Sequence, residues 1–399
     1  MHNTYFFESW WNMKSQYKLL TFLSNFNLGI SVPFLSLILC EHGCSLENIG
    51  IIIAIFSTTV VLLELPSGIF ADLFGRKSSF LLAQAGGLIF SVILLLSKSF
   101  FLTAVGIIFY GVFSAFSSGS LDALAVEDFI KYNGESALSK AISTFQIYTC
   151  AGIALGALCS GFLPYFQGYL IHLVLKIFIG IVTFLLALNL PAKTRSSQQP
   201  ISLKIHLHKM YDLFSSNKFL RQLAICIIVI STVQASVETY WQPQISTFQL
   251  EYLQPLLGLL SACAYFATIA GCTLISKFKL LSSRKSQTVY LSTAFVFLMI
   301  VFSFAFAKNV ILYATIYLFI YLLIGMISVA EQTIINLETE DSVRASILSA
   351  NSLFAKLGGI ASGGISSIIL QVSGINVVWI ALSIVAIFVL LLQKFKTRL

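Results

Sequence analysis

Twelve apolar stretches follow one another along this chain of 399 residues. Each is roughly twenty residues long, which is the length of α-helix that crosses the hydrocarbon core of a bilayer. Backbone groups in lipid must satisfy one another, so continuous apolar runs predict helices rather than the short alternating strands of a barrel. The predicted spans are 19–41, 48–70, 79–98, 101–122, 141–163, 169–190, 220–242, 254–276, 288–307, 310–333, 346–371 and 375–393. The sequence therefore predicts an all-α polytopic membrane protein.

The composition supports this class. The chain is 57% hydrophobic and 10% charged, whereas a soluble domain has about 25% charged residues. The first apolar run is full length and no small-residue cleavage site follows it, so we interpret it as the first span rather than a cleaved signal. Seven cysteines are scattered without a C-x-x-C pair, and only His42 lies near Cys40 and Cys44. We therefore expect neither a disulfide framework nor a metal site.

The basic residues predict the orientation of the chain. If the N-terminus is cytoplasmic, 20 of the 24 lysines and arginines lie in inside segments, and only Lys98 and Lys308 lie outside. Lys176 and Lys356 lie within spans. Cytoplasmic loops carry an excess of Lys and Arg. We therefore expect a multi-pass protein of the cell membrane with both termini cytoplasmic, and we read the net charge of +8 as orientation rather than nucleic-acid binding.

A polar, basic stretch divides the predicted spans into two sets of six. It covers residues 191–219 and separates an N-terminal half, 1–190, from a C-terminal half, 220–399. Connections between the other spans are short, so this stretch is a linker between two repeats. Apolar and basic residues alternate over 204–214. That pattern predicts a short helix on the membrane surface.

A specific pattern lies between the second and third predicted spans. Gly68, Asp72, Gly75, Arg76 and Lys77 have the spacing G-x-x-x-D-x-x-G-R-K. The glycines allow a tight reversal and a close helix approach. The acid lies where the next helix exposes free N–H groups, and the two basic residues favour the cytoplasmic surface. This loop resembles the signature between the second and third helices of the major facilitator superfamily.

The resemblance implies two six-helix bundles around a central cavity that opens alternately to each side. It implies secondary transport of a small solute through the lipid bilayer, and we expect a monomer. No nucleotide-binding loop, Walker lysine motif or nucleophile elbow occurs. We therefore expect a transporter rather than an enzyme, without a cofactor, driven by a gradient. The segment beginning at Arg344 also resembles the family's, and Arg344 is expected to partner Glu338, Glu340 or Asp341.

Two predicted spans carry glycines at packing intervals. Gly152, Gly156 and Gly161 of the fifth span resemble the family's antiporter motif g-x-x-x-G-P-x-x-G-G, although Ala157 replaces the proline and Ser160 a glycine. A plain face of small residues for helix packing is the alternative interpretation. The eleventh span carries a second glycine face: Gly358, Gly359, Gly363 and Gly364. We expect the glycine faces of both spans to lie at the interface between the halves.

Ionisable and amide side chains within spans are candidates for a proton or substrate site, because they are costly there. Glu64 shares a helix face with Gly68 and Asp72 and is expected to titrate or to gate the cytoplasmic side. Gln234 and Glu238 form a polar stripe near the outer end of the seventh span. A structural hydrogen bond or an interface position is the alternative for each candidate. Lys356 is expected to pair with a carboxylate. The remaining candidates are Asp122, Glu331, Asn25 and Asn27.

Within the superfamily, the sequence favours export of a small amphipathic compound, such as a drug or antibiotic, by proton-coupled antiport. The antiporter-like fifth span, the abundant aromatic residues and the embedded acids suit that function. Proton coupling has the weakest support, because Ile107 stands four residues before Gly111, where the drug/proton antiporter pattern has arginine. The alternative is uptake of a nutrient, such as a sugar or organic acid, since Lys176 and Lys356 suit an anion.

Overall fold

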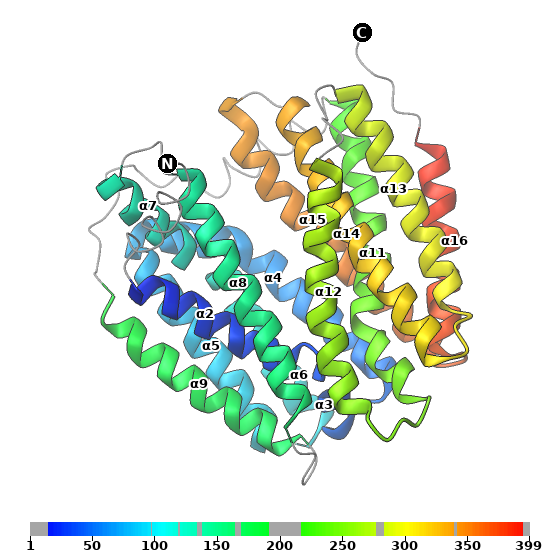
Figure 1. Cartoon of the computed structure of the whole chain (residues 1–399), viewed down its shortest axis with the longest axis horizontal. Coiled ribbons are helices and arrows are strands. Elements are labelled where there is room, and N and C mark those ends of the chain that lie inside the picture. The colour runs from blue at the N-terminus through cyan, green and yellow to red at the C-terminus, as the bar shows by residue number, and fades with distance from the viewer. Residues whose placement is uncertain are drawn as a thin grey trace, which may run out of the picture. The chain divides into compact units, whose positions relative to one another are not determined.

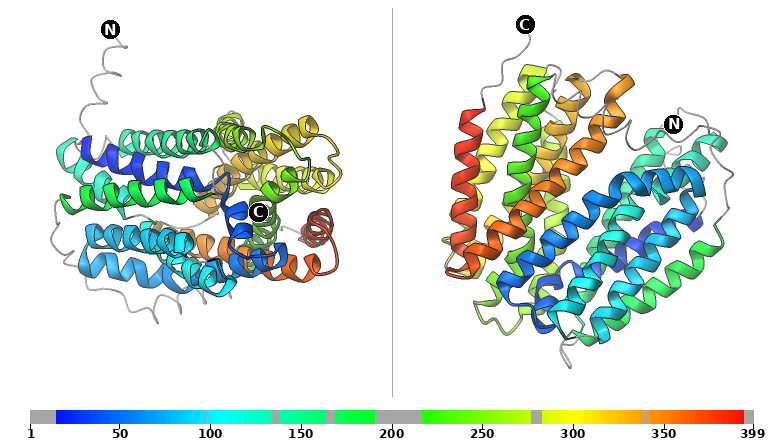
Figure 2. Two further views of the ribbon diagram at one scale, coloured as in Figure 1. Left: turned by 90° about the horizontal axis from the view of Figure 1, so that it is seen from below. Right: turned by 180° about the vertical axis from the view of Figure 1, so that it is seen from behind.

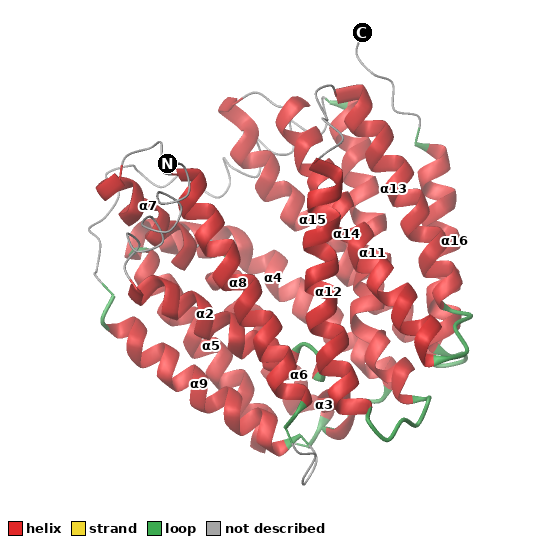
Figure 3. Cartoon of the chain, in the orientation of Figure 1, coloured by secondary structure: helices red, strands yellow, loops and turns green. Residues whose placement is uncertain are grey.

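A computed structural model gives the arrangement of the chain and describes residues 15–96, 98–118, 120–133, 138–163, 169–190, 217–276, 283–338 and 341–393. These residues form helices joined by short turns, without a strand (Figure 3). The first seven helices are α2 (Ser15–Ser31), α3 (Leu35–Glu41), α4 (Leu46–Phe74), α5 (Arg76–Leu96), α6 (Phe100–Ser117), α7 (Leu121–Asn133) and α8 (Leu138–Gly161). The others are α9 (Leu170–Leu188), α11 (Lys218–Ser246), α12 (Leu253–Ser276), α13 (Ser283–Phe304), α14 (Val310–Glu338), α15 (Asp341–Leu370) and α16 (Ile375–Leu392).

The helices account for the predicted number of membrane spans. Within the described residues, eleven helices are long and apolar enough to cross a membrane, and the count reaches twelve when the bent pair α2 and α3 is taken as one span. The prediction of an all-helical protein with twelve spans is therefore confirmed. The predicted surface helix over 204–214 lies outside the described residues.

The first span is broken, which corrects the prediction of one continuous helix over 19–41. α2 and α3 are bent by 54° relative to each other across Val32–Phe34. Pro33 lies in this break, where it has no N–H to donate and clashes with a continuing helix. The side chain of Phe34 is fully buried. The proline was visible in the sequence, but the apolar run around it concealed the break.

A turn interrupts the fourth predicted span near its inner end, although the candidate membrane span Phe100–Val126 extends past that turn. α6 stops at Ser117, and a separate helix, α7, begins at Leu121. Ser120 Oγ donates a hydrogen bond to the Ser117 carbonyl oxygen at 3.0 Å, a local bond that competes with continuation of the helix. Asp122 was predicted near the inner end of the fourth span, and it lies there within the candidate span Phe100–Val126. It is exposed in the first turn of α7, where the helix dipole favours an acid.

The connection between the second and third spans is a single residue. α4 continues to Phe74, Gly75 has a φ of 87°, and α5 begins at Arg76. Only glycine adopts that left-handed conformation without strain, so the predicted reversal is at Gly75 alone. Gly68 and Asp72 lie within α4, which agrees with the helix face that they were predicted to share with Glu64, and neither belongs to the turn itself. A Cβ on Gly68 would meet no atom within 4 Å, so the expectation of a close helix approach at that residue is wrong.

The chain forms two compact units, and each unit combines three separate segments of the sequence. Unit 1 contains Met1–His42, Leu62–Pro200 and Gln254–Ala262, and unit 2 contains Gly43–Val61, Ile201–Leu253 and Cys263–Leu399. In unit 1, α2 packs against α8 and α9, and α5 packs against α6 and α9 (Figure 1). In unit 2, α11 packs against α15 and α16, and α13 packs against α14 and α16 (Figure 2).

Candidate functional site

A carboxylate and an amide lie together on α11 in unit 2. Gln234 Nε2 donates a hydrogen bond to Glu238 Oε1 at 2.8 Å. The spacing of four residues brings both side chains to one face of the helix. The Glu238 side chain is exposed although it belongs to a span. Its electrostatic neighbours are Tyr317 and Tyr321 of α14 and Lys356 of α15, so the carboxylate faces a polar environment as membrane energetics require.

Aromatic side chains stand beside this carboxylate. The Tyr317 and Tyr321 rings are 4.9 Å apart between centroids, and Trp241 stacks on Tyr317 at 4.5 Å. Tyr313 donates a hydrogen bond from its hydroxyl to the Trp241 carbonyl oxygen at 2.7 Å. Tyr265 of α12 interacts electrostatically with Tyr317 and Tyr321. We call Tyr265, Tyr317 and Tyr321 the tyrosine wall. Tyr317 is buried beneath Trp241, so the half-buried Tyr265 and Tyr321 provide the accessible ring faces and hydroxyls of the wall.

Lys356 lies in the same unit and interacts with both an aromatic ring and an acid. Its Nζ is 5.4 Å from the centroid of the Phe56 ring, a cation–π distance. It also attracts the Glu238 carboxylate. Among the described residues these two charges do not form a direct ion pair. The sequence predicted that Lys356 pairs with a carboxylate, without indicating which one. The structure places the Glu238 carboxylate within electrostatic reach of Lys356 but, within the described residues, shows no direct ion pair between them.

Glu331 belongs to a second polar group within unit 2. Asn351 Nδ2 donates a hydrogen bond to Glu331 Oε1 at 2.8 Å, which links α14 to α15. Tyr290 of α13 and Cys226 of α11 lie beside the carboxyl group. The Asn351 Oδ1 is buried without a hydrogen-bond partner in the described part of the chain, and the buried Tyr290 hydroxyl lies beside the Glu331 carboxyl group. Sequence reasoning missed Tyr290, which lies near the start of the ninth predicted span.

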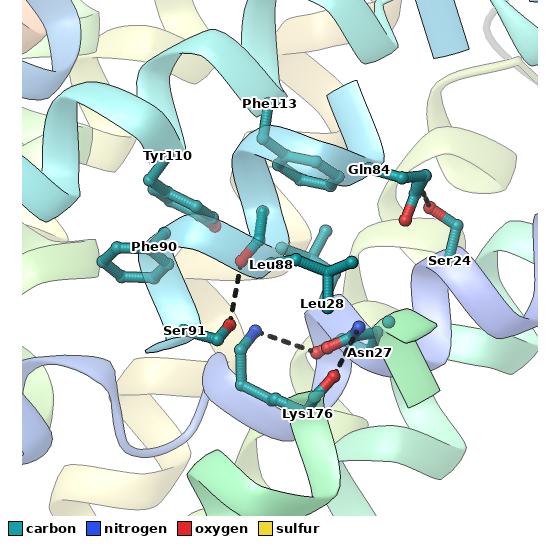
Figure 4. Close-up of a pocket in the computed structure, with 12 residues that line it drawn as sticks. Ser24, Asn27, Leu28, Gln84, Leu88, Phe90, Ser91, Tyr110, Phe113 and Lys176 are labelled. Carbon is teal, nitrogen blue, oxygen red and sulfur yellow. Dashed lines mark hydrogen bonds between the residues drawn. The ribbon is translucent and has the colours of Figure 1, made fainter. Parts of the chain in front are cut away.

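In unit 1, a buried lysine links α9 to α2 (Figure 4). Lys176 is 6% exposed. Its Nζ donates hydrogen bonds to the Asn27 carbonyl oxygen at 3.3 Å and to Ser31 Oγ. Asn27 Nδ2 donates in return to the Lys176 carbonyl oxygen at 3.1 Å. The ammonium thus lies at the C-terminal end of α2, where the helix dipole favours a cation. Asn27 therefore joins two helices.

A small polar cavity surrounds this lysine (Figure 4). Gln84 Nε2 donates a hydrogen bond to Ser24 Oγ at 3.1 Å on one side of the cavity. The cavity volume is about 20 Å³, which is room for a water molecule rather than a solute. Sequence reasoning did not select Gln84, although it is the one amide in the third predicted span. The other labelled residues that line the cavity include Leu28, Leu88, Phe90, Ser91, Tyr110 and Phe113.

Asn25 also makes contacts between helices. Its Nδ2 donates to the Thr21 carbonyl oxygen at 2.8 Å within α2 and lies 3.5 Å from Thr149 Oγ1 of α8. The sequence left open whether Asn25 lines a cavity or bonds between helices. The structure shows the contact between α2 and α8.

Glycines of α8 permit close packing inside unit 1. A Cβ on Gly152 would lie 2.7 Å from the Phe22 carbonyl oxygen of α2, and one on Gly156 would collide with the Phe26 carbonyl oxygen. A Cβ on Gly161 would lie 2.9 Å from Gly258 Cα of α12. Backbone atoms occupy the space in each case, so helices approach closely along this face.

Glycines of α15 make the corresponding contacts inside unit 2. A Cβ on Gly363 would collide with the Gly50 carbonyl oxygen and lie 2.8 Å from the Ala54 amide nitrogen, both on α4. A Cβ on Gly359 would collide with Ser57 Oγ of the same helix. Gly364, in contrast, has no atom within 4 Å of a Cβ position.

Lys77 of the signature pattern contacts the end of α9. Lys77 Nζ donates hydrogen bonds to the Leu188 and Leu190 carbonyl oxygens at 2.7 and 2.6 Å, at the end of α9. Asp72 is exposed, and Glu64 and Arg76 are half-buried. The backbone of Arg344 lies in the first turn of α15, but its side chain is outside the described part.

The comparison with protein families identifies the chain. Residues 19–363 match the sequence model of the Major Facilitator Superfamily. The chain belongs to the major facilitator superfamily. This superfamily member is 24% identical over 265 residues to "Uncharacterized MFS-type transporter YxaM" of Bacillus subtilis (strain 168), and the match spans 63% of each chain. Membership agrees with the candidate membrane spans of the described residues and makes the chain a multi-pass membrane protein.

Solved structures share the fold of this superfamily member. The nucleoside transporter NupG has a TM-score of 0.78 with 15% identity, over 95% of this chain and 98% of that one. A bacterial homolog of the human lysosomal transporter Spinster has a TM-score of 0.66 with 13% identity, over 94% of this chain and 93% of that one. At these identities the likeness concerns the fold alone.

Proposed function

We propose that the chain exports a small amphipathic organic compound, of the drug or antibiotic kind, by proton-coupled antiport. The observation that carries the proposal is the exposed Glu238 carboxylate, which is held by Gln234 and lies beside the tyrosine wall. A carboxylate attracts a cationic group, and aromatic faces accept an apolar body as well as a cation. An acid in a membrane span is costly and is therefore a candidate for a functional site.

Proton coupling is proposed to act through at least one embedded acid. Antiport requires a group that binds a proton when the solute leaves and releases it when the solute binds. Glu238 and Glu331 suit that role because each lies in a span with polar neighbours. Glu64 and Asp122 are the other candidates, and their positions in the last turns of α4 and the first turn of α7 would serve gating.

Uptake of an organic anion is the second candidate function. The observation that favours it is the pair of membrane-embedded lysines. Lys176 is buried with only neutral hydrogen-bond partners in the described part of the chain, and Lys356 is half-buried. An anionic solute would compensate such charges. The two candidates predict opposite directions of net transport.

Flux measured in proteoliposomes with an imposed pH gradient tests the proposal. Cells that overexpress the protein are first compared with deletion cells for growth on a panel of toxic amphipathic compounds. A compound that overexpression protects against is then followed in proteoliposomes of defined orientation. We expect movement from the cytoplasmic side, dependent on the gradient and abolished by an uncoupler. Concentrative movement in the opposite direction would refute export and support uptake.

The residue assignment is tested by replacing each acid with its amide. Glu64→Gln, Asp122→Asn, Glu238→Gln and Glu331→Gln are compared with Glu251→Gln, an exposed acid in the turn between α11 and α12. At least one of the four should uncouple flux from the gradient, and the Glu251 variant should behave as wild type. If all four behave as wild type and the uncoupler has no effect, proton coupling through these acids is wrong.

A further inference from the structure

An acid and a base lie near each other in unit 2 without pairing directly in the described part of the chain. Glu238 is on α11 and Lys356 is on α15, and their charges attract. Each has its own local partner. Gln234 donates to the Glu238 carboxylate at 2.8 Å, and the Phe56 ring lies 5.4 Å from the Lys356 ammonium. Gln234 and Phe56 are both uncharged, so neither neutralises the charge beside it. The carboxylate and the ammonium therefore remain available to a bound solute.

Close helix contacts fix the positions of both charges. Two residues after Lys356, a Cβ on Gly358 would lie 2.6 Å from the Ile228 carbonyl oxygen and 2.7 Å from Ser231 Cβ, both on α11. Gly359 lies against Ser57 of α4, one residue beyond Phe56. The α15 helix is thus held against the helix of the acid and against the helix of the ring. Close contacts of this kind leave α15 little freedom to shift against α11 and α4.

The charges around the site leave it close to neutral overall. The carboxylate and the ammonium cancel, and the tyrosine wall adds hydroxyls and ring faces without charge. The other embedded acid of unit 2, Glu331, is engaged by Asn351 and lies beside Tyr290 and Cys226. A purely cationic solute would be attracted by Glu238 but repelled by Lys356. A purely anionic solute would meet the reverse.

We propose that this site selects dipolar solutes. A cationic group, such as an amine, binds the Glu238 carboxylate, an anionic group, such as a carboxylate, binds the Lys356 ammonium, and an apolar or aromatic body contacts the tyrosine wall. Lys356 is thereby a specificity-determining residue that excludes simple cations. This inference rests on the proposed function in taking Glu238 as the solute-binding acid, but it does not depend on the direction of transport.

Transport of two probes of different charge tests the inference. Norfloxacin is a zwitterion near neutral pH, and ethidium is a permanent cation of comparable size. Their flux and their binding, followed through quenching of protein fluorescence, are measured for wild type, Lys356→Gln, Lys356→Arg and Glu238→Gln. Lys308→Gln, an exposed lysine between α13 and α14, is the matched control. Size-exclusion profiles establish that each variant is folded.

The expected result is a change of selectivity rather than a uniform loss. Lys356→Gln and Glu238→Gln should each lower norfloxacin kcat/KM by about tenfold, because each removes one of two charge-assisted contacts. Lys356→Gln should improve ethidium binding, since it removes a repelling charge, whereas Glu238→Gln should weaken it. Lys356→Arg should retain norfloxacin, and Lys308→Gln should change neither probe.

Several outcomes would overturn the inference. An equal loss of both probes in Lys356→Gln would indicate a structural role for the lysine. Wild type that binds and transports ethidium but not norfloxacin would contradict dipolar selection and leave export standing. Wild type that binds neither probe would also contradict dipolar selection.

One outcome separates the inference from the proposed function. Norfloxacin flux with the expected charge dependence but directed inward would refute export and support the inference.

Discussion

The contact between α2 and α8 predicts a specific penalty for one methyl group. In Gly156→Ala the new Cβ collides with the Phe26 carbonyl oxygen and lies 3.1 Å from Gly29 Cα. Both obstacles are backbone, so no side-chain rotation relieves them, and the helices must separate. Overpacking of this kind costs about 1–3 kcal/mol. Alanine in place of glycine also favours the helix by about 1 kcal/mol, which masks part of the penalty.

A control variant removes the helix-propensity contribution. Gly364→Ala makes the same replacement inside α15, where a Cβ meets no atom within 4 Å. The difference between the two variants therefore reports the packing penalty alone, about 1–3 kcal/mol. Thermal stability of detergent-solubilised protein, read as the fraction that remains monodisperse after heating, should fall for Gly156→Ala and be maintained for Gly364→Ala. Gly156→Leu should abolish folded protein. If Gly156→Ala is as stable as Gly364→Ala, the close approach of α2 and α8 is wrong.

Three further predictions concern residues with simpler surroundings. Asp72→Asn should reduce flux by up to about fivefold at normal expression, because the acid stands just before the N-terminus of α5, where a charge contributes about 0.3–1 kcal/mol and can bias a conformational equilibrium; full turnover would remove Asp72 from that role. Lys77→Gln should lower thermal stability by about 1 kcal/mol, since it removes the cation that donates hydrogen bonds to the Leu188 and Leu190 carbonyl oxygens, and Lys77→Arg should recover part of it. Tyr313→Phe should cost about 0.5–1.5 kcal/mol through loss of the hydrogen bond to the Trp241 carbonyl, whereas Tyr252→Phe, at an exposed position, should leave the unfolding temperature unchanged.

The sequence predicted the spans because lipid imposes a local rule. Each span must be apolar over its whole length and must satisfy its own backbone, so membrane helices can be recognised without knowing their neighbours. The turn at Gly75 was predictable for a similar reason, since a glycine between two helices suits a positive φ. Pro33 carried an equally local signal for the broken first span.

The partners of the polar residues were not predictable in the same way. The position of Lys356 along its helix shows that it is embedded, but its neighbours depend on the rotation of α15 and on the glycines that set its distance from α4 and α11. Lys77 bonds to carbonyls more than a hundred residues away. Such pairs follow from the packing of whole helices, which a single sequence does not contain.

The single-residue turn at Gly75 fixes the rotational phase of two helices relative to each other. An α-helix advances about 100° per residue, so one residue inserted between Phe74 and Arg76 would rotate the whole of α5 by that angle. Lys77 would then point away from the end of α9, and Ser79 would lose its hydrogen bond to the Phe116 carbonyl oxygen at 3.1 Å. We therefore expect related proteins to lack insertions and deletions at this turn. A probe or tag inserted there should disrupt the packing of unit 1 rather than report on it.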